Sequence, residues 1–379
     1  MMRLSDGDYS EIDGRLAAHD AFLRARYPGE RAGRQPIHTV YIPADKLSAY
    51  PGWGTEALRA MDENDFPWPD PTIRAKLELE PIEDLRVDFE DGYGVRDDDQ
   101  EDAAVRSAAA LVSKGPRPPF LGIRIKSLEA GTRRRALRTL DMFLDSYQDL
   151  FTITLPKVSG TDQVRAMVTL CEKLERGYGL SEGALTFEVQ IELPSAVLAA
   201  DGTATVARLI TAAGGRCTGL HYGTYDYSAA AGVAAAYQSM EHPAADYAKA
   251  VMQAAAAQTG VRLSDGSTNV LPAGPAAAVR EAWQLHHRLV RRSLERGFYQ
   301  GWDLHPAQLP SRYAATYQFF RDGRDVAIER LHRYLHRQDS GIADEPATAR
   351  ALAGYLLRGL DCGAFDDAGF PRAELAHLA

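Results

Sequence analysis

Short runs rich in β-branched and aromatic residues recur along the middle of the chain. They lie at residues 37–42, 85–89, 120–125, 151–155, 186–191, 217–222, 261–270 and 298–304. Between most of them, apolar residues follow helical spacing, as at 161–176, 195–213 and 276–295. Strands that alternate with helices favour parallel pairing through right-handed crossovers. Eight such units over about 270 residues predict an α/β fold of the (β/α)₈ TIM-barrel type.

The predicted barrel covers residues 37–310, with helical segments on both sides of it. An N-terminal helical segment is expected at 1–36. A C-terminal helical cap or oligomerisation arm is expected at 311–379, where helical spacing recurs at 313–320, 326–336 and 348–360. This division predicts one large barrel domain with a helical C-terminal extension.

Two segments interrupt the simple repeat. An insertion at about 50–80, which carries Pro67, Pro69 and Pro71, is expected to form a loop over one end of the barrel. The alanine-rich stretch 229–257 is expected to be helical, because alanine has the highest helix propensity. A doubly wound open sheet is the alternative architecture, and it is disfavoured because no glycine-rich phosphate loop follows the first strand.

The composition is that of an ordinary globular protein. The chain has 379 residues, 45% of them hydrophobic and 25% charged, with a formal net charge of −9. No nucleic-acid partner is expected, because phosphate binding needs clustered Lys and Arg, and no long basic run occurs. The short clusters Arg133–Arg135 and Arg288 with Arg291 and Arg292 are interpreted as solvated helix faces.

Membrane and secreted locations are also disfavoured. No run approaches the ~20 consecutive apolar residues that a membrane span needs, so no membrane partner is expected. The acidic N-terminal residues lack the pattern of a signal peptide. Cys171, Cys217 and Cys362 are scattered and form no CxxC motif, which is typical of reduced thiols in a cytoplasmic protein.

Two carboxylates at the ends of neighbouring predicted strands are candidate metal ligands. Glu192 follows the strand at 186–191, and Asp226 follows the strand at 217–222. Functional groups of TIM barrels gather at the carboxyl ends of the strands. Two carboxylates with water or substrate oxygens are the usual ligands of Mg²⁺. The pair predicts a divalent-metal site, although each acid alone would suit an exposed strand–loop junction.

Three basic residues at strand ends are candidate substrate ligands. Arg124 follows an apolar run, and its fork geometry suits a substrate carboxylate, although a salt bridge to Glu90 or Asp91 is the alternative. Lys157 suggests a Schiff-base aldolase, but acidic surroundings would raise its pKa and disfavour the neutral amine. His305, before Pro306, is expected either to contact the substrate or to cap the barrel.

Six motifs in order resemble those of the citrate-lyase β-subunit and HpcH/HpaI aldolase superfamily, which is related to malyl-CoA lyases and malate synthases. They are VDFEDGYG (87–94), IRIK (123–126), TLPKV (154–158), VQIELPSAV (189–197), GLHYGTYDYS (219–228) and GFYQGWDLHPAQL (297–309). Each motif is short, but their order and spacing are specific, and they cover roughly residues 37 to 320. The fifth motif is more similar to the malate-synthase version.

The resemblance implies a Mg²⁺-dependent barrel, with Mn²⁺ as a possible substitute, that makes or breaks a carbon–carbon bond beside a carbonyl. By position, Glu192 and Asp226 would hold the metal, and Arg124 would bind and polarise a 2-oxo acid. Glu90 and Asp91 would bind metal-bound water or the substrate. Related lyases often take a further Asp from a neighbouring subunit, so a homo-oligomer is expected.

Some alternatives stay open. The segment Tyr41–Asp45 lacks the proline-glycine turn common in CoA-using members, and a long insertion follows it, so CoA thioester use is not settled by the sequence. A malate-synthase-like condensing enzyme is the nearest alternative activity. A non-catalytic barrel that binds a keto acid is the alternative of another class.

Overall fold

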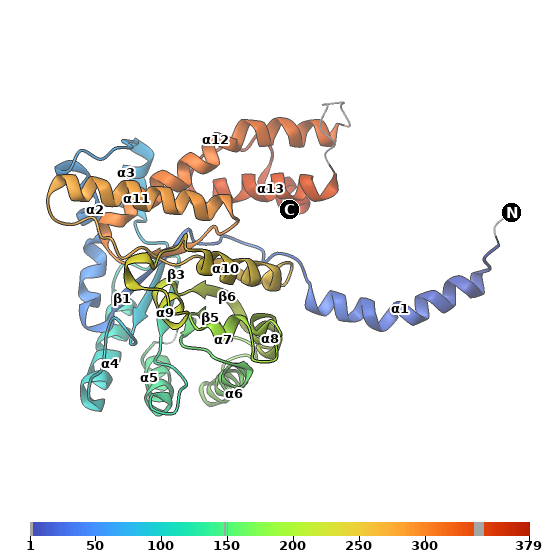
Figure 1. Ribbon diagram of the computed structural model, residues 1–379, viewed down its shortest axis with the longest axis horizontal. Coiled ribbons are helices and arrows are strands. Elements are labelled where there is room, and N and C mark those ends of the chain that lie inside the picture. The colour runs from blue at the N-terminus through green and yellow to red at the C-terminus, as the bar shows by residue number, and fades with distance from the viewer. Residues whose placement is uncertain (1–2, 148, 150, 337–344) are drawn as a thin grey trace.

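The eight strands form one parallel sheet that curls into a barrel. This computed structural model describes residues 3–147, 149, 151–336 and 345–379. The strand order is β7-β6-β5-β4-β3-β2-β1-β8. Backbone hydrogen bonds from Asp265 N to Gln300 O (2.8 Å) and from Trp302 N to Gly266 O (3.2 Å) bring the β7 and β8 edges together. The sheet is therefore a nearly closed (β/α)₈ barrel (Figure 1), as predicted, and not a doubly wound open sheet.

The strand bounds agree closely with the sequence expectation except near β7. The strands are β1 (His38–Pro43), β2 (Asp84–Asp88), β3 (Phe120–Arg124), β4 (Thr152–Leu155), β5 (Thr186–Ile191), β6 (Cys217–Tyr222), β7 (Arg262–Ser264) and β8 (Gly301–Asp303). The run 261–270 was predicted too long. The regular strand ends at Ser264. Asp265 and Gly266 still bond to Gln300 and Trp302 through the backbone, and the Asp265 side chain accepts from Gly266 N (2.8 Å) and Lys249 Nζ (2.9 Å).

Helices follow the strands and cover the outside of the barrel (Figure 1). They are α4 (Asp98–Lys114), α5 (Arg133–Ser146), α6 (Thr161–Tyr178), α7 (Pro194–Val197), α8 (Thr205–Ala212), α9 (Thr224–Ala230), η2 (Ala235–Tyr237), α10 (Pro243–Ala256) and α11 (Ala276–Glu295). The alanine-rich stretch 229–257 is not one helix. Gly232, with φ +76°, and Pro243 at the start of α10 break it, so backbone constraints outweigh alanine propensity.

The helical run expected at 195–213 is also divided. Helix α7 ends at Val197, and a bridge between Leu198 and Ala204 separates it from α8. Asp201 binds Thr203 N (3.0 Å) and closes this turn. The correction matters for the site, because the short α7 follows Glu192 directly.

The insertion after β1 is helical and not the expected loop. It contains η1 (Ala44–Gly52), α2 (Trp53–Glu63) and α3 (Pro71–Leu79). Asp70 caps α3 by accepting a hydrogen bond from Thr72 N (2.8 Å), and Pro71 occupies the first helical position. The prolines therefore start a helix here. Helix α2 packs against η3 (Pro306–Gln308), which follows β8 at the carboxyl end of the barrel.

The chain ends carry further helices. Helix α1 (Asp6–Arg26) has no buried residue and extends away from the barrel (Figure 1). After β8, α12 (Leu309–Leu335), α13 (Pro346–Cys362) and α14 (Arg372–Leu378) form the C-terminal helices, and α12 runs unbroken through both expected segments 313–320 and 326–336. Residues 1–2 and 337–344 of the two predicted terminal segments lie outside the described residues.

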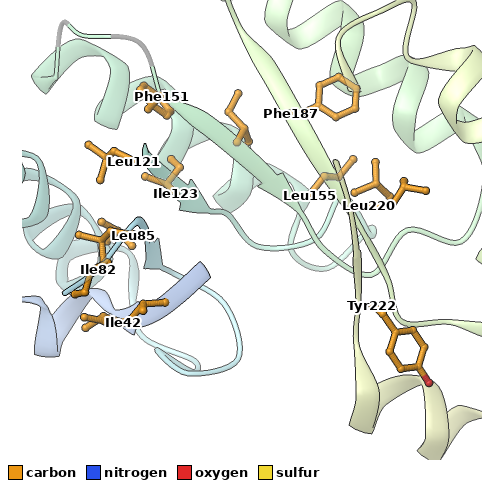
Figure 2. Packing of buried hydrophobic residues seen from close by; sticks show 14 of the residues in the cluster. Ile42, Ile82, Leu85, Leu121, Ile123, Phe151, Leu155, Phe187, Leu220 and Tyr222 are labelled. Atoms are coloured by element: carbon orange, nitrogen blue, oxygen red, sulfur yellow. The ribbon is translucent and has the colours of Figure 1, made fainter. Parts of the chain in front are cut away.

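The outward-facing residues of the strands build the main apolar core. Ile42, Leu85, Ile123, Leu155 and Phe187 are all buried between the strands and the surrounding helices (Figure 2). Full burial of such a side chain contributes roughly 1.5–3 kcal/mol. Because side chains alternate along a strand, this arrangement leaves the other residues of each strand to point into the barrel.

The fold also shows where the cysteines and the arginine clusters lie. Cys171, Cys217 and Cys362 are buried and free. Within the described ranges, no helix combines the length and hydropathy of a membrane span. The arginine clusters lie on α5 and α11, where Arg135 contacts Asp102 (2.8 Å) and Arg292 contacts Asp246 (2.7 Å).

Candidate active site

Polar residues occupy every second position of β2 and β5. Strand β2 carries Asp84, Arg86 and Asp88, and the matching series on β5 and just beyond it is Glu188, Gln190 and Glu192. Arg86 Nη2 donates to Glu188 Oε2 (2.9 Å), so the two series face each other across the barrel. The inward faces therefore form a buried polar interior.

Deep in the barrel, charges are paired. We call Asp84, Arg86, Glu188 and His221 the inner layer. Arg86 binds Asp84 as well as Glu188, and His221 Nε2 lies 3.1 Å from Glu188 Oε2. A Cβ at Gly122 of β3 would stand 2.7 Å from Arg86 Nε, so the guanidinium needs a glycine there.

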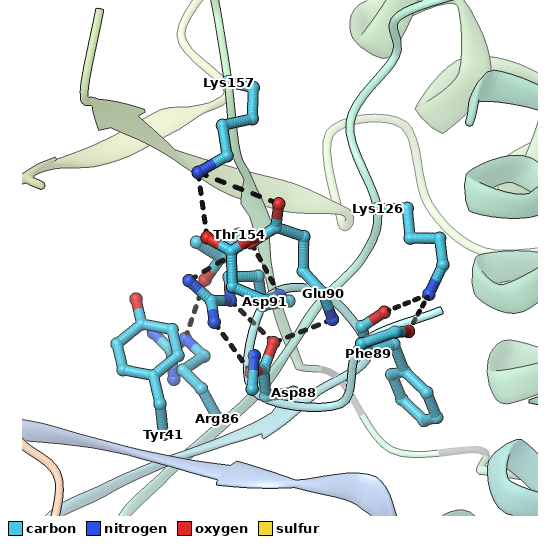
Figure 3. A network of polar contacts seen from close by, with 12 residues as sticks. Tyr41, Arg86, Asp88, Phe89, Glu90, Asp91, Lys126, Thr154 and Lys157 are labelled. Atoms are coloured by element: carbon cyan, nitrogen blue, oxygen red, sulfur yellow. Dashed lines mark hydrogen bonds and ion pairs between the residues drawn. The ribbon is translucent and has the colours of Figure 1, made fainter. Parts of the chain in front are cut away.

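At the carboxyl ends of the strands, four acids gather around one lysine. We call Glu90, Asp91, Glu192 and Asp226 the carboxylate cluster. Lys157 Nζ lies 2.8 Å from Asp91, 2.9 Å from Asp226, 3.4 Å from Glu192 and 3.9 Å from Glu90. Figure 3 shows Lys157 pointing toward Glu90 and Asp91. The structure thus brings together the two predicted metal ligands, Glu192 and Asp226, and three other predicted site residues, Glu90, Asp91 and Lys157.

Lys157 is held in place by its backbone. Its φ is +52°, in the left-handed region that side-chain-bearing residues rarely adopt, and its N–H donates to Glu192 Oε1 (2.5 Å). Burial alone lowers the pKa of Lys157, but the surrounding carboxylates outweigh it and raise that pKa above its ordinary value. The lysine therefore stays an ammonium, which argues against the Schiff-base alternative.

Two acids of the carboxylate cluster are hard to ionise. Burial, reinforced by Asp226, raises the pKa of Glu192 to about 7. Burial also raises the pKa of Glu90 to about 8, against the opposing charge of Arg124. Four acids therefore share too little positive charge, and an added cation would stabilise their ionised forms.

Arg124 is oriented by a residue that the sequence analysis left unassigned. Its Nε and Nη2 donate to the two oxygens of Asp88 (2.7 Å each). The predicted salt bridge to Glu90 is present as a longer contact of 3.5 Å. The ring of Tyr41 lies 4.9 Å below the guanidinium carbon. Arg124 thus has its fork occupied by Asp88 and turns Nη1 toward Glu90.

Asp88 also shapes the loop that carries two acids of the cluster. Its Oδ1 accepts from Glu90 N (2.9 Å) and its Oδ2 from Gly92 N (3.0 Å). A Cβ at Gly92 would meet Asp88 Oδ2 at 2.6 Å, so glycine is needed for this turn. One buried carboxylate therefore positions both Arg124 and the Glu90–Asp91 segment (Figure 3).

His305 lies outside the contacts of the carboxylate cluster. Its Nδ1 accepts a hydrogen bond from Ala307 N (3.1 Å) and caps η3. Burial lowers the pKa of His305, which favours the neutral ring that this cap requires. This hydrogen bond caps η3 and not the barrel, so both roles expected from the sequence, a substrate contact and capping of the barrel, stay predictions.

The donor set fits a hard divalent cation, although the side chains here converge on lysine. Across the described ranges, no group of three or more His, Cys, Asp or Glu side chains is placed to hold a metal ion. The acids instead share the ammonium of Lys157. Their ligand atoms are all carboxylate oxygens, which Mg²⁺ and Mn²⁺ prefer, and they carry more negative charge than Lys157 neutralises.

Sequence reasoning missed Asp88, Gln190 and the inner layer. Gln190 is fully buried between Glu188 and Glu192 on β5, and neither its amide nitrogen nor its oxygen has a partner among the described residues. A signal was available, because polar residues at every second position of an otherwise apolar strand indicate a polar barrel interior. Which charges pair across that interior is not a local property.

Comparisons with known structures agree with this architecture. The chain is similar to a malate synthase of Haloferax volcanii, in a magnesium/glyoxylate complex, with a TM-score of 0.57 and 12% identity over 92% of this chain and 99% of that one. It is also similar to the CitE protein of Mycobacterium tuberculosis, in complex with magnesium, acetoacetate and coenzyme A, with a TM-score of 0.54 and 17% identity over 87% and 99%. The implied relationship to these barrels is confirmed at the level of the fold.

Family membership comes from the sequence itself. A search of curated proteins found no match. A family model described as "Domain of unknown function (DUF6986)" matches residues 16–377. Because that match spans nearly the whole chain, the protein belongs to the DUF6986 family.

Proposed function

We propose that the protein is a Mg²⁺-dependent carbon–carbon lyase or aldolase that acts on a 2-oxo acid or a hydroxyacyl substrate. The observation that carries this proposal is the meeting of the carboxylate cluster with Arg124 and Lys157 at the barrel mouth. Carboxylates that could hold a metal therefore form ion pairs with the two cationic side chains that could bind a substrate carboxylate. Solved barrels of the same fold include proteins with magnesium and a small keto acid bound.

Glu192 and Asp226 would hold the metal, with Mn²⁺ as a substitute for Mg²⁺. They follow neighbouring strands and both contact the ammonium of Lys157. The bound ion would act as a Lewis acid for the charge that develops beside the substrate carbonyl. Gln190 is buried next to Glu192 and has no side-chain partner among the described residues, so it offers an amide to the substrate or to a bound water.

The remaining residues bind the substrate and move its proton. Arg124, fixed by Asp88, supplies positive charge that needs no reorganisation during the reaction. Lys157 and Arg124 would together bind the substrate carboxylate. Glu90, with its pKa raised to about 8 by burial, is suited to accept or donate the substrate hydroxyl proton near neutral pH, and its Oε2 lies 3.5 Å from Arg124 Nη1.

A condensing enzyme of the malate-synthase kind is the second candidate. The segment 219–228 supports it through its resemblance to the malate-synthase motif, and both reactions need a stabilised enolate. Helix α2 of the insertion packs against η3 near the carboxyl end of β8, and the segment Tyr41–Asp45 before the insertion lacks the proline-glycine turn of CoA-using members. Use of a CoA thioester is therefore a separate question from use of a 2-oxo acid.

Turnover assays separate these activities. Purified protein is offered 4-hydroxy-2-oxo acids and hydroxyacyl-CoA thioesters with Mg²⁺ or with EDTA, and pyruvate or glyoxylate release is measured. A lyase releases the product only with the metal. Acetyl-CoA with glyoxylate tests condensation through the appearance of free thiol. Binding of the keto acid without turnover would favour a non-catalytic barrel.

Two variants test the residue assignments. The double variant Glu192→Gln/Asp226→Asn is expected to lose Mn²⁺ binding in calorimetry, and binding like that of the wild type would refute the metal site. The matched control is Glu182→Gln, an exposed acid in the loop before β5. Arg124→Ala is expected to weaken oxaloacetate, pyruvate or glyoxylate binding, and unchanged affinity would remove its role.

A further inference from the structure

A second cavity lies at the end of the barrel opposite the candidate active site. Its volume is about 580 Å³, within the range of small-molecule sites. On one side are the segments that precede β1 and β8 and the start of β7, including Arg31, Tyr299 and Arg262. On the other side are α13 and α14, including Arg358 and Arg372. Because all strands are parallel, segments that precede them lie at the end away from the carboxylate cluster.

The cavity carries more positive than negative charge. Its lining contains four arginines and two acids, namely Arg31, Arg262, Arg358, Arg372, Glu30 and Asp361. Arg358 is paired with Glu30 (2.5 Å), and Arg372 is paired with Asp361 (2.5 Å). The structure shows no carboxylate partner for Arg31 or Arg262 within its described ranges. Arg31 and Arg262 therefore leave a positive excess in the cavity, even with the terminal carboxylate of Ala379 in its lining, in a chain whose net charge is −9.

Arg262 is hydrogen-bonded but not neutralised. Its Nη1 donates to Arg34 O (2.7 Å) and its Nη2 to Gly33 O (2.6 Å), so it ties the loop before β1 to β7. Burial, and then the charges of Arg31 and Arg358, lower the pKa of Arg262. A half-buried cation beside two others costs free energy unless an anion compensates it.

The rest of the lining combines three glutamines, Gln35, Gln253 and Gln258, with an apolar wall. Val261 and Leu263 border β7, Leu357 comes from α13, and Tyr299 stacks under the guanidinium of Arg358, with its ring centroid 4.4 Å from Arg358 Cζ. An occupant that satisfied the charge alone would leave this surface in contact with water. The lining therefore matches a molecule with one anionic end and one apolar part.

We propose that this cavity binds a small organic anion, with a phosphate or carboxylate group held by Arg31 and Arg262 and an apolar body against Val261, Leu357 and Tyr299. The ligand touches the barrel and the C-terminal helices at once. Binding therefore stabilises the junction between them and raises the thermal unfolding midpoint by mass action. The site is independent of the proposed metal and substrate.

Calorimetric titration with phenyl phosphate, benzoate and inorganic phosphate tests the site. EDTA is present throughout, so that phosphate is not held by a metal. Phenyl phosphate is expected to bind with a stoichiometry of one and more tightly than inorganic phosphate, because only the former uses the apolar wall. The comparison of phenyl phosphate with benzoate decides between a phosphate and a carboxylate ligand.

Charge-removing variants make the test decisive. Arg31→Gln is expected to weaken binding of the tighter organic anion about tenfold or more. Arg31 is exposed and forms no ion pair with another described residue, so this variant should fold normally even if Arg262→Gln does not. The matched control, Arg106→Gln, removes an exposed arginine of α4 and should leave affinity unchanged.

Two results would overturn the proposal. One is the absence of wild-type binding to either organic anion at millimolar concentration. The other is equal affinity of the wild type and Arg31→Gln. Glu192→Gln separates this site from the barrel mouth, because anion binding should be unaffected by that substitution even where the proposed lyase activity is lost or was never present.

Discussion

The barrel contains two charged regions that differ in how completely their charges are paired. In the inner layer, Arg86 lies between Asp84 and Glu188, and His221 adds a second contact to Glu188. At the mouth, the carboxylate cluster and Asp88 make five acids, and Lys157 and Arg124 are the cations that form ion pairs with them among the described residues. The two regions lie on the same strands, so the difference is one of charge and not of fold.

The pKa values of Glu188 and Glu192 reflect that difference, whereas burial raises the pKa of Asp84 in the inner layer, and Lys157 overcomes burial to lower the pKa of Asp91 at the mouth. Burial by itself would raise the pKa of Glu188, but Arg86 and His221 overcome it and hold that pKa well below its ordinary value. At the mouth, burial wins and raises the pKa of Glu192 to about 7. Paired buried charges specify the barrel geometry, whereas an excess of buried negative charge suits a site that binds a cation.

The largest expected effect comes from breaking the inner layer. Arg86→Met leaves Asp84 and Glu188 buried without their shared cation, which should reduce the free energy of unfolding by about 3–5 kcal/mol. Urea denaturation measures this loss. Arg106→Met, at an exposed arginine of α4, is the control and should change it by less than about 0.5 kcal/mol. A loss below about 1 kcal/mol at Arg86 would contradict the structural role of the layer.

At the mouth, a substitution is expected to change metal binding more than stability. Glu192→Gln removes one charge from a negative excess, so the free energy of unfolding should stay the same or rise. Mn²⁺ affinity should fall roughly a hundredfold or more, because a direct ligand is lost. Denaturation and calorimetry on the same sample measure both quantities, with Glu182→Gln as the control. A marked loss of stability with intact Mn²⁺ binding would make Glu192 a structural residue.

A smaller effect is expected for the lysine that the cluster shares. Lys157→Met removes a positive charge within 4 Å of four acids, so Mn²⁺ affinity in the absence of substrate should rise about tenfold. Turnover should fall, because a substrate ligand is lost. Lys173→Met, on the exposed face of α6, is the control. Weaker Mn²⁺ binding in Lys157→Met would show that the lysine supports the metal site.

The smallest effect concerns acid stability at another paired site. Arg312, His38 and His286 surround Asp303 at 2.8, 3.1 and 3.2 Å. Burial alone would raise the pKa of Asp303, but Arg312 and the histidines hold it well below its ordinary value. Its contribution is therefore fully present above the unfolded pKa of about 3.9 and is lost as the pH falls toward the folded pKa.

Unfolding of the wild type and Asp303→Asn between pH 3 and 7 measures this contribution. The wild-type advantage should be constant above about pH 5 and then shrink by up to about 1.4 kcal/mol per pH unit below about pH 4. A difference that does not vary with pH would mean that Asp303 acts through its shape and hydrogen bonds alone.

Much of the fold was predictable because its signals are local. The strands at 186–191 and 217–222 match their predicted bounds, because β-branched and aromatic residues gather in these short runs between helical segments. The error at 229–257 has a local cause as well, because Gly232 and Pro243 carry more weight than the alanines around them. The prediction of a loop for the insertion was wrong because proline occurs both in loops and at the first position of helices. Here Asp70 caps α3, so Pro71 begins a helix.

The candidate site was predictable in part. Glu192 and Asp226 were placed at strand ends, and the structure puts both within reach of Lys157. The main partner of Arg124 was missed, because Asp88 is paired with it through the β2–β3 register. Nothing near Arg124 in the sequence distinguishes Asp88 from Glu90 or Asp91 as that partner.

The sequence by itself determined the order of strands and helices, the barrel class and the strand-end positions of the functional acids. Those properties follow from periodicity, propensity and short motifs, all of which act over a few residues. Tertiary structure alone decided that Lys157 would sit among the acids at 90, 91, 192 and 226, and that Arg86 and Glu188 would pair across the interior. Barrel closure sets those distances, and no local pattern encodes them.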